Sequence, residues 1–170
     1  MNWETTCCFT GHRPEKLPWG HNEADKRCIA LKRRLRDAVA AAYEEGFRHF
    51  ICGMARGCDF YFAETVLELR CEHPDITLEA AIPCAQQSAS WSANHRERWA
   101  HIVAQCDKTT VLQEFYTPDC MLRRNRYMVD RSSLVIAVYD GSNGGTRRTL
   151  EYALSRKIPF VDIDPAATGV

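Results

Sequence analysis

The chain has 170 residues, of which 45% are hydrophobic and 26% charged, a composition typical of one globular domain with its own core. Its 22 lysines and arginines balance its 22 aspartates and glutamates, and this zero net charge makes a dominant role in binding nucleic acid or a membrane surface unexpected. The apolar runs are too short to span a bilayer and the N-terminus lacks signal-peptide features, so we expect one cytoplasmic domain over residues 1–170.

Short apolar runs along the chain have the length and composition of buried strands. The expected strands are Thr6–Thr10, Arg48–Cys52, Leu78–Ile82, Thr109–Gln113, Leu134–Tyr139 and Phe160–Ile163. Segments with helical periodicity separate them, which is typical of right-handed βαβ units. The sequence therefore predicts an α/β fold, a single domain whose mainly parallel sheet carries helices on both faces.

The first helix has the clearest pattern. Apolar residues recur every three or four positions from Cys28 to Ala42, and Gly46 supplies a natural end. Further helices are expected around Phe62–Leu67, Ser90–Gln105, Asp119–Asp130 and Leu150–Leu154. In sheets of this kind ligands bind outside the carboxyl ends of the strands, so the loops that follow the strands are the candidate site.

The loop after the first expected strand reads TGHRP. Gly11 lets the chain leave the strand sharply, while His12 and Arg13 place an ionisable ring and a permanent cation at the strand tip. The alternative is a surface loop stiffened by Pro14 and Pro18.

The loop after the second expected strand lies within ICGMARGCDF. Gly53 and Gly57 permit close backbone approach, and the N–H groups around Gly57, together with Arg56, would suit an anion. Asp59 opens the next helix, and capping that helix is the favoured interpretation for its side chain.

The loop after the fifth expected strand reads DGSNGGTRRTLEYA. Gly141, Gly144 and Gly145 precede Thr146 at a helix start, an arrangement that offers free N–H groups and the positive helix end to a phosphate. The order of residues fits neither GxxxxGK[ST] nor GxGxxG. A flexible turn is the alternative.

A basic segment, MLRRNRYMVDRSS, precedes that fifth strand. It contains Arg123, Arg124, Asn125, Arg126 and Arg131. Two or three guanidinium groups that converged here would bind phosphate oxygens in pairs, whereas the alternative is surface ion pairing with nearby acidic residues.

Nine cysteines are scattered along the chain without a CxxC pair, and several lie inside apolar runs. We expect reduced thiols that pack as small hydrophobic side chains, and no metal site.

Taken together, these segments resemble the YpsA-like family of the SLOG superfamily, whose relatives include DprA and the LOG phosphoribohydrolases. The segments that carry the resemblance are TGHRP, GMARGCDFYFAE, AIPCAQQSASW, RRNRYMVDRSSLVIAVYDG and GGTRRTLEYA, and they extend from about Thr6 to Ile163. The resemblance implies a Rossmann-like domain that binds a nucleotide or nucleotide-derived ligand. GMARGCD is similar to a G-x-A-x-G-x-D stretch of DprA, and RRNR to a run that precedes a strand in DprA.

The residues expected to bind this ligand come from all four segments. They are Gly11, Arg13, Gly53, Arg56, Gly57, Arg124, Asn125, Arg126, Gly141, Gly144, Gly145 and Thr146. A sensor or regulatory domain for a nucleotide-like small molecule is the favoured interpretation. The identity of any cofactor stays open, and so does self-association into a homo-oligomer.

Two other functions are weighed against binding alone. A LOG-like enzyme would cleave an N-glycosidic bond, with Glu151 or Asp59 stabilising the positive charge that develops on the ribose and His12 assisting the leaving base. In the LOG pattern G-G-x-G-T-x-x-E, however, Arg147 and Arg148 replace the second-half glycine and threonine. The third function, a DprA-like DNA-binding module, is disfavoured by the zero net charge.

Overall fold

The computed structural model describes residues 2–167. Its strands are β1 (Thr6–Gly11), β2 (His49–Cys52), β3 (Thr77–Ile82), β4 (Lys108–Val111), β5 (Leu134–Val138) and β6 (Phe160–Ile163). Its α-helices are α1 (Lys26–Glu44), α2 (Cys58–Glu72), α3 (Ala93–Gln105), α4 (Cys120–Asp130) and α5 (Gly145–Ser155), and a short 3-10 helix, η2 (Pro14–Lys16), follows β1. All the expected strands and helices form, with ends that differ by a few residues.

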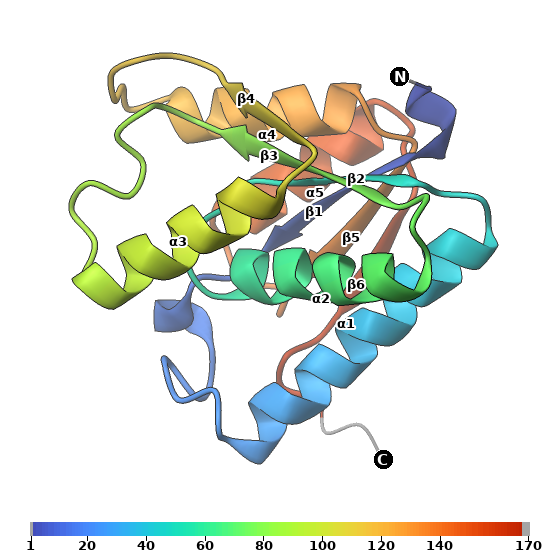
Figure 1. Cartoon of the computed structure of the whole chain (residues 1–170), viewed down its shortest axis with the longest axis horizontal. Helices are drawn as coiled ribbons and strands as arrows, with labels where there is room; N and C mark the ends of the chain where they lie inside the picture. Colours follow the sequence, from blue (N-terminus) through green and yellow to red (C-terminus); the bar gives the residue numbers. More distant parts are fainter. Residues whose placement is uncertain (1, 168–170) are drawn as a thin grey trace.

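The strands form one parallel sheet in the order β4-β3-β2-β1-β5-β6. The chain builds outward from β1 to β4, then returns to the other side of β1 to add β5 and β6 (Figure 1). The predicted single α/β domain with a Rossmann-like sheet is therefore confirmed. Because the strand order reverses between β1 and β5, a crevice is expected at the carboxyl ends of these two strands.

Helices cover both faces of the sheet, as predicted. Alternate residues of β1 point to opposite faces, so Cys7 and Phe9 pack with the buried residues of α1 and α2, whereas Cys8 packs with those of α4 and α5. Figure 1 shows α1 and α2 on one side of the sheet and α4 and α5 on the other. The crevice between β1 and β5 thus lies where the two helical layers diverge.

The cysteines belong mainly to the core. Seven are buried, at positions 7, 8, 28, 52, 58, 84 and 120. Burial raises the pKa of the Cys8 thiol to about 12, so this thiol stays protonated at neutral pH. Within residues 2–167, no three His, Cys, Asp or Glu side chains gather as a metal-ligand set, and none of the helices has the length and apolar character needed to cross a membrane.

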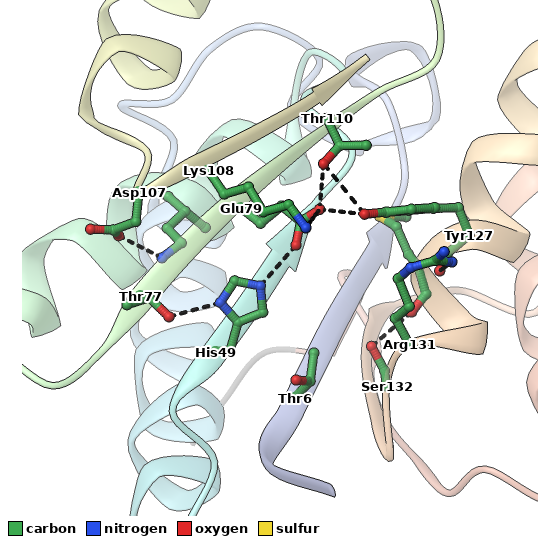
Figure 2. Close-up of polar contacts among 12 residues, drawn as sticks. Thr6, His49, Thr77, Glu79, Asp107, Lys108, Thr110, Tyr127, Arg131 and Ser132 are labelled. Carbon is green, nitrogen blue, oxygen red and sulfur yellow. Dashed lines mark hydrogen bonds and ion pairs between the residues drawn. The ribbon is translucent and has the colours of Figure 1, made fainter. Parts of the chain in front are cut away.

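A buried carboxylate on the α4 side of the sheet joins three strands to α4. Glu79 of β3 is fully buried, and its Oε2 accepts a hydrogen bond from His49 Nε2 of β2 at 2.8 Å (Figure 2). Its Oε1 accepts from the hydroxyls of Thr110 in β4 at 2.8 Å and Tyr127 in α4 at 2.7 Å. Burial alone would raise the pKa of Glu79, but these hydrogen bonds outweigh it and hold the pKa at about 2.

We predict that Tyr127→Phe destabilises the protein more than Tyr152→Phe does. Tyr127 donates to the buried Glu79 carboxylate, and loss of a hydrogen bond to a charged group costs roughly 1.5–3 kcal/mol. Tyr152 makes an equally short bond, 2.7 Å to Asp130, at the exposed surface, where the loss is expected to stay below about 1 kcal/mol. Urea unfolding of both variants measures the difference, and equal losses would contradict the role given to Glu79.

The stability that comes from the Glu79 network is expected to depend on pH in acid. Because the folded-state pKa of about 2 lies below the ordinary value of about 4.3 for glutamate, the contribution is complete above the ordinary value and is lost as pH falls toward 2. The stability advantage of the wild type over Tyr127→Phe should therefore shrink between these two pH values. An advantage that stayed constant in urea unfolding from pH 5 to pH 2 would show that Glu79 is not its source.

Candidate ligand-binding site

A cavity of about 450 Å³ opens at the carboxyl end of β1. Its walls come from the loop after β1, the start of α2, the N-terminal half of α4 and the start of α5. Nine of the candidate residues from the sequence line it: Gly11, His12, Arg13, Asp59, Arg124, Asn125, Gly144, Gly145 and Thr146. Four loops that are far apart in the sequence thus meet at the point where the strand order reverses.

The start of α5 offers backbone donors to the cavity. Gly144 is the N-cap residue, and among residues 2–167 no side chain caps this helix end. Gly145 and Thr146 follow in the first turn and line the cavity, as does Arg148. The uncapped N–H groups and the partial positive charge of the helix end together favour an anion at this wall.

Lys16 brings a second cation to the same wall. It lies on η2 after β1, and its Nζ donates to Ser142 Oγ at 3.3 Å and to the carbonyl of Asn143. A Cβ on Gly144 would lie only 2.6 Å from that Nζ, so the lysine lies directly against the glycine loop. Lys16 and the loop before α5 therefore form one surface.

The guanidinium of Arg124 occupies the space that the missing side chain of Gly53 leaves free. The guanidinium of Arg124 is buried and donates to the carbonyls of Gly53 and, at 3.4 Å, Ala81, while its Nε donates to Asn125 Oδ1 at 2.7 Å. A Cβ at position 53 would lie 2.5 Å from Arg124 Nη1. Gly53 does not line the cavity itself, but its missing side chain leaves the room that Arg124 occupies.

Asp59 faces the cavity and does not cap α2, which corrects the expectation from the sequence. The N-cap is Gly57, with a φ of 85° that favours glycine, and Asp59 lies in the first turn. Asp59 Oδ2 accepts from Ala55 N–H at 2.9 Å. Within the described chain no group donates to Oδ1, and no buried polar side-chain atom lacks a partner, so Oδ1 is open to the cavity.

The ionisation of Asp59 reflects this position. Burial raises its pKa above the ordinary value, although the positive charge of Arg124 and the hydrogen bond from Ala55 act in the opposite direction. A buried carboxyl with one unpaired oxygen is suited to accept a hydrogen bond from a ligand hydroxyl or N–H group.

His12 is paired with Asp140, a residue that the sequence did not single out. The imidazole is 3% exposed, and its Nε2 lies 2.9 Å from Asp140 Oδ1. Hydrogen bonds from Ser142, and then contact with His12, hold the pKa of Asp140 at about 2, so it is a carboxylate at neutral pH.

Two of the candidate arginines, Arg56 and Arg126, do not line the cavity. Arg56 reaches Glu15 at 3.3 Å and lies over the ring of Trp91, while Arg126 lies over the ring of Tyr152. The basic segment therefore does not converge: only Arg124 among its arginines lines the cavity.

The remaining three candidates also lie outside the lining. Gly57 packs against the loop after β1, where an added Cβ would lie 2.8 Å from Pro14 Cδ. Glu151 is 59% exposed and pairs with Arg147 on the outer face of α5 at 2.9 Å. Gly141 is exposed in the loop before α5.

Sequence reasoning missed Lys16, Asp140 and Arg148. Asp140 directly follows a strand and precedes Gly141, so its place after β5 was a usable signal. Lys16 carried no such signal, because its contact with Asn143 joins segments that are distant in the chain.

Comparison with known families supports the resemblance seen in the sequence. The YpsA model, described as the YspA SLOG family, matches residues 7–158. A UPF0398 protein from Bacillus thuringiensis (strain Al Hakam) is 27% identical over 151 residues, covering 87% of this chain and 81% of the relative. A UPF0398 protein from Bacillus cereus (strain Q1) matches to the same extent.

Solved structures share the fold at low sequence identity. DNA processing protein A (DprA) from Helicobacter pylori, described with a single-stranded DNA binding mode, aligns with a TM-score of 0.63 and 17% identity. That alignment covers 92% of this chain and 64% of the DprA chain. DprA from Streptococcus pneumoniae aligns with a TM-score of 0.61 and 15% identity, and this chain, at 94% coverage, spans only 50% of it.

We predict that Gly53→Ala is markedly destabilising and that Gly145→Ala is not. The new Cβ at position 53 would meet a buried, hydrogen-bonded guanidinium, and overpacking of this kind costs roughly 1–3 kcal/mol. At position 145 no neighbouring atom of the described residues lies within 4 Å of an added Cβ, so the change in stability should stay within about 0.5 kcal/mol. Thermal and urea unfolding compare the two, and equal stability would mean that Arg124 does not need the space.

Proposed function

Because the chain belongs to the YpsA SLOG family, we propose that it binds a nucleotide or nucleotide-derived ligand in the cavity, as a sensor or regulatory domain. The observation that carries the proposal is the uncapped start of α5, which lines a cavity rich in cationic side chains. The cavity volume lies within the range of 300–1,000 Å³, approximately, that is typical of small-molecule sites.

The phosphate end of the ligand is assigned to α5. Gly145 and Thr146 supply N–H donors at the positive end of the helix, and Lys16 and Arg148 add positive charge. Lys16 already occupies two hydrogen bonds with the glycine loop, which leaves the third donor of its ammonium group for the ligand.

The opposite wall is suited to the rest of the ligand. Asp59 Oδ1 accepts hydrogen bonds, and the amide of Asn125, held by Arg124, supplies a polar group beside it. Arg13, Lys16, Arg124 and Arg148 line the cavity against the two carboxyl groups of Asp59 and Glu15. This local excess of positive charge in a chain of zero net charge favours an anionic ligand.

A second candidate, hydrolysis of an N-glycosidic bond, draws support from Asp59 and His12 lining the same cavity. Glu151 is a poor catalytic carboxylate because it lies outside the lining and pairs with Arg147, so Asp59 would have to stabilise the charge on the ribose. Incubation with nucleoside monophosphates separates the two functions: binding alone returns the nucleotide intact. Release of free base that survives Glu151→Gln but not Asp59→Asn would establish the enzyme.

We predict that Gly145→Asp weakens nucleotide binding by about tenfold to a hundredfold, since one charge-assisted hydrogen bond is worth roughly 1.5–3 kcal/mol. The aspartate would place negative charge beside the phosphate, while an acidic residue at a helix start preserves the helix. Leu154→Asp, on the exposed end of the same helix, is the matched control for added charge.

The experiment begins by screening AMP, ADP, ATP and a single-stranded oligonucleotide by thermal shift, followed by calorimetric titration of whichever nucleotide binds. Affinity that is unchanged in Gly145→Asp would remove the phosphate assignment. A failure of all three nucleotides to bind the wild type, with tight binding of the oligonucleotide, would replace the proposed function with DNA binding.

A further inference from the structure

His12 has one ring nitrogen held by the protein and one that faces the cavity. Nε2 lies 2.9 Å from Asp140 Oδ1 and 3.2 Å from the backbone nitrogen of Asp140. In residues 2–167 no group bonds to Nδ1, yet no buried side-chain nitrogen or oxygen lacks a partner. Since His12 lines the cavity, Nδ1 is the atom that it presents there.

The partner of Nε2 decides where the proton lies. A carboxylate only accepts hydrogen bonds, so the shorter contact requires Nε2 to carry the hydrogen and donate to Asp140. The backbone N–H of Asp140 lies 3.2 Å from Nε2 and donates to that nitrogen in the other neutral tautomer, in which Nε2 carries the lone pair. When Nε2 carries the hydrogen and donates to the carboxylate, the neutral ring presents a lone pair at Nδ1 to the cavity.

Asp140 also belongs to the loop assigned to phosphate. Its Oδ1 accepts from Ser142 N–H at 2.9 Å, and the chain reaches Gly144, the N-cap of α5, two residues after Ser142. The pairing of Gly11 with Val138 holds the ends of β1 and β5 side by side. Through Asp140, His12 therefore contacts the loop before α5, whose backbone N–H groups are proposed to bind the phosphate.

We propose that Asp140 positions His12 to bind the ligand's phosphate through Nδ1, and that phosphate binding takes up a proton from solvent. The inference rests on the proposed function and adds to it. A lone pair on Nδ1 would repel a phosphate oxygen, whereas an imidazolium donates Nδ1–H to that oxygen and Nε2–H to Asp140. The Asp140 carboxylate stabilises the positive ring that results.

Several other ionisable groups surround the ring and contribute to its field. Tyr139 lies beside it, with ring centroids 6.1 Å apart. The charged or ionisable groups that share the cavity are Arg13, Glu15, Lys16, Asp59, Arg124 and Arg148. Single-residue substitutions are therefore needed to separate the contribution of His12 to proton uptake from the contributions of these groups.

The test is calorimetric titration of AMP into the full-length wild type, His12→Asn and Asp140→Asn, at pH 6 and pH 8. At each pH, two buffers that differ in ionisation enthalpy count the protons taken up. The phosphate of AMP titrates in this range too, so the contribution of His12 is the wild-type proton count minus that of His12→Asn. Asp162→Asn, an exposed position on β6, is the matched control for a lost carboxylate.

The wild type should take up more protons than His12→Asn, by up to about one per AMP, and bind about tenfold tighter at pH 6. Asp140→Asn should shift this extra uptake to lower pH, while Asp162→Asn should match the wild type. Asp140 is 31% exposed, so its variant tests the inference even where His12→Asn fails to fold.

Equal proton counts and equal affinities in the wild type, His12→Asn and Asp140→Asn would overturn the inference while leaving AMP binding intact. Absence of binding by the wild type to any nucleotide would instead remove the proposed function and this inference with it.

Discussion

The central position of β1 constrains what the protein can build around it. Parallel strands extend from β1 in both directions, with β2, β3 and β4 on one side and β5 and β6 on the other. Their connecting helices therefore divide between the two faces and leave the carboxyl end of β1 uncovered. Most residues of the candidate site lie in or beside loops that leave a strand or enter a helix at this edge.

Within this frame, α4 is the element that gives the cavity a firm wall. Near its C-terminal end, Tyr127 bonds to the buried Glu79, and one turn earlier Arg124 bonds to the carbonyls of Gly53 and Ala81. Tyr127 bonds to β3, and Arg124 bonds to β3 and to the loop between β2 and α2, so α4 is held by hydrogen bonds as well as by apolar packing. A wall fixed in this way positions Arg124 and Asn125 without help from a ligand.

Most of the fold was predictable because its signals are local. Apolar runs, helical periodicity and Gly46 after the first helix identify the elements, and their alternation implies a parallel sheet. The meeting of the four loops followed from topology, which needs no side-chain detail.

The errors concern the directions of individual side chains and the contacts between distant residues, which local sequence patterns do not specify. Aspartate is a common N-cap residue, but Gly57 takes the N-cap position of α2 and the carboxyl of Asp59 faces the cavity. Neighbouring arginines diverge because successive positions on a helix point in different directions, so Arg124 is buried while Arg126 lies over Tyr152. The pairs His12–Asp140 and His49–Glu79 join strands whose register the sequence does not specify.

The raised pKa of Asp59 has a consequence for the energy landscape of the protein. Burial makes the charged form of this carboxyl less favourable in the folded chain than in the unfolded chain, whereas the three hydrogen-bond partners of Glu79 favour the charged form of that residue. Folding thus favours the charged form of Glu79 and disfavours the charged form of Asp59. Local conflicts of this kind with the fold are typical of functional sites. A ligand that donates a hydrogen bond to Asp59 would stabilise the charged carboxylate, and this stabilisation would add to the free energy of binding.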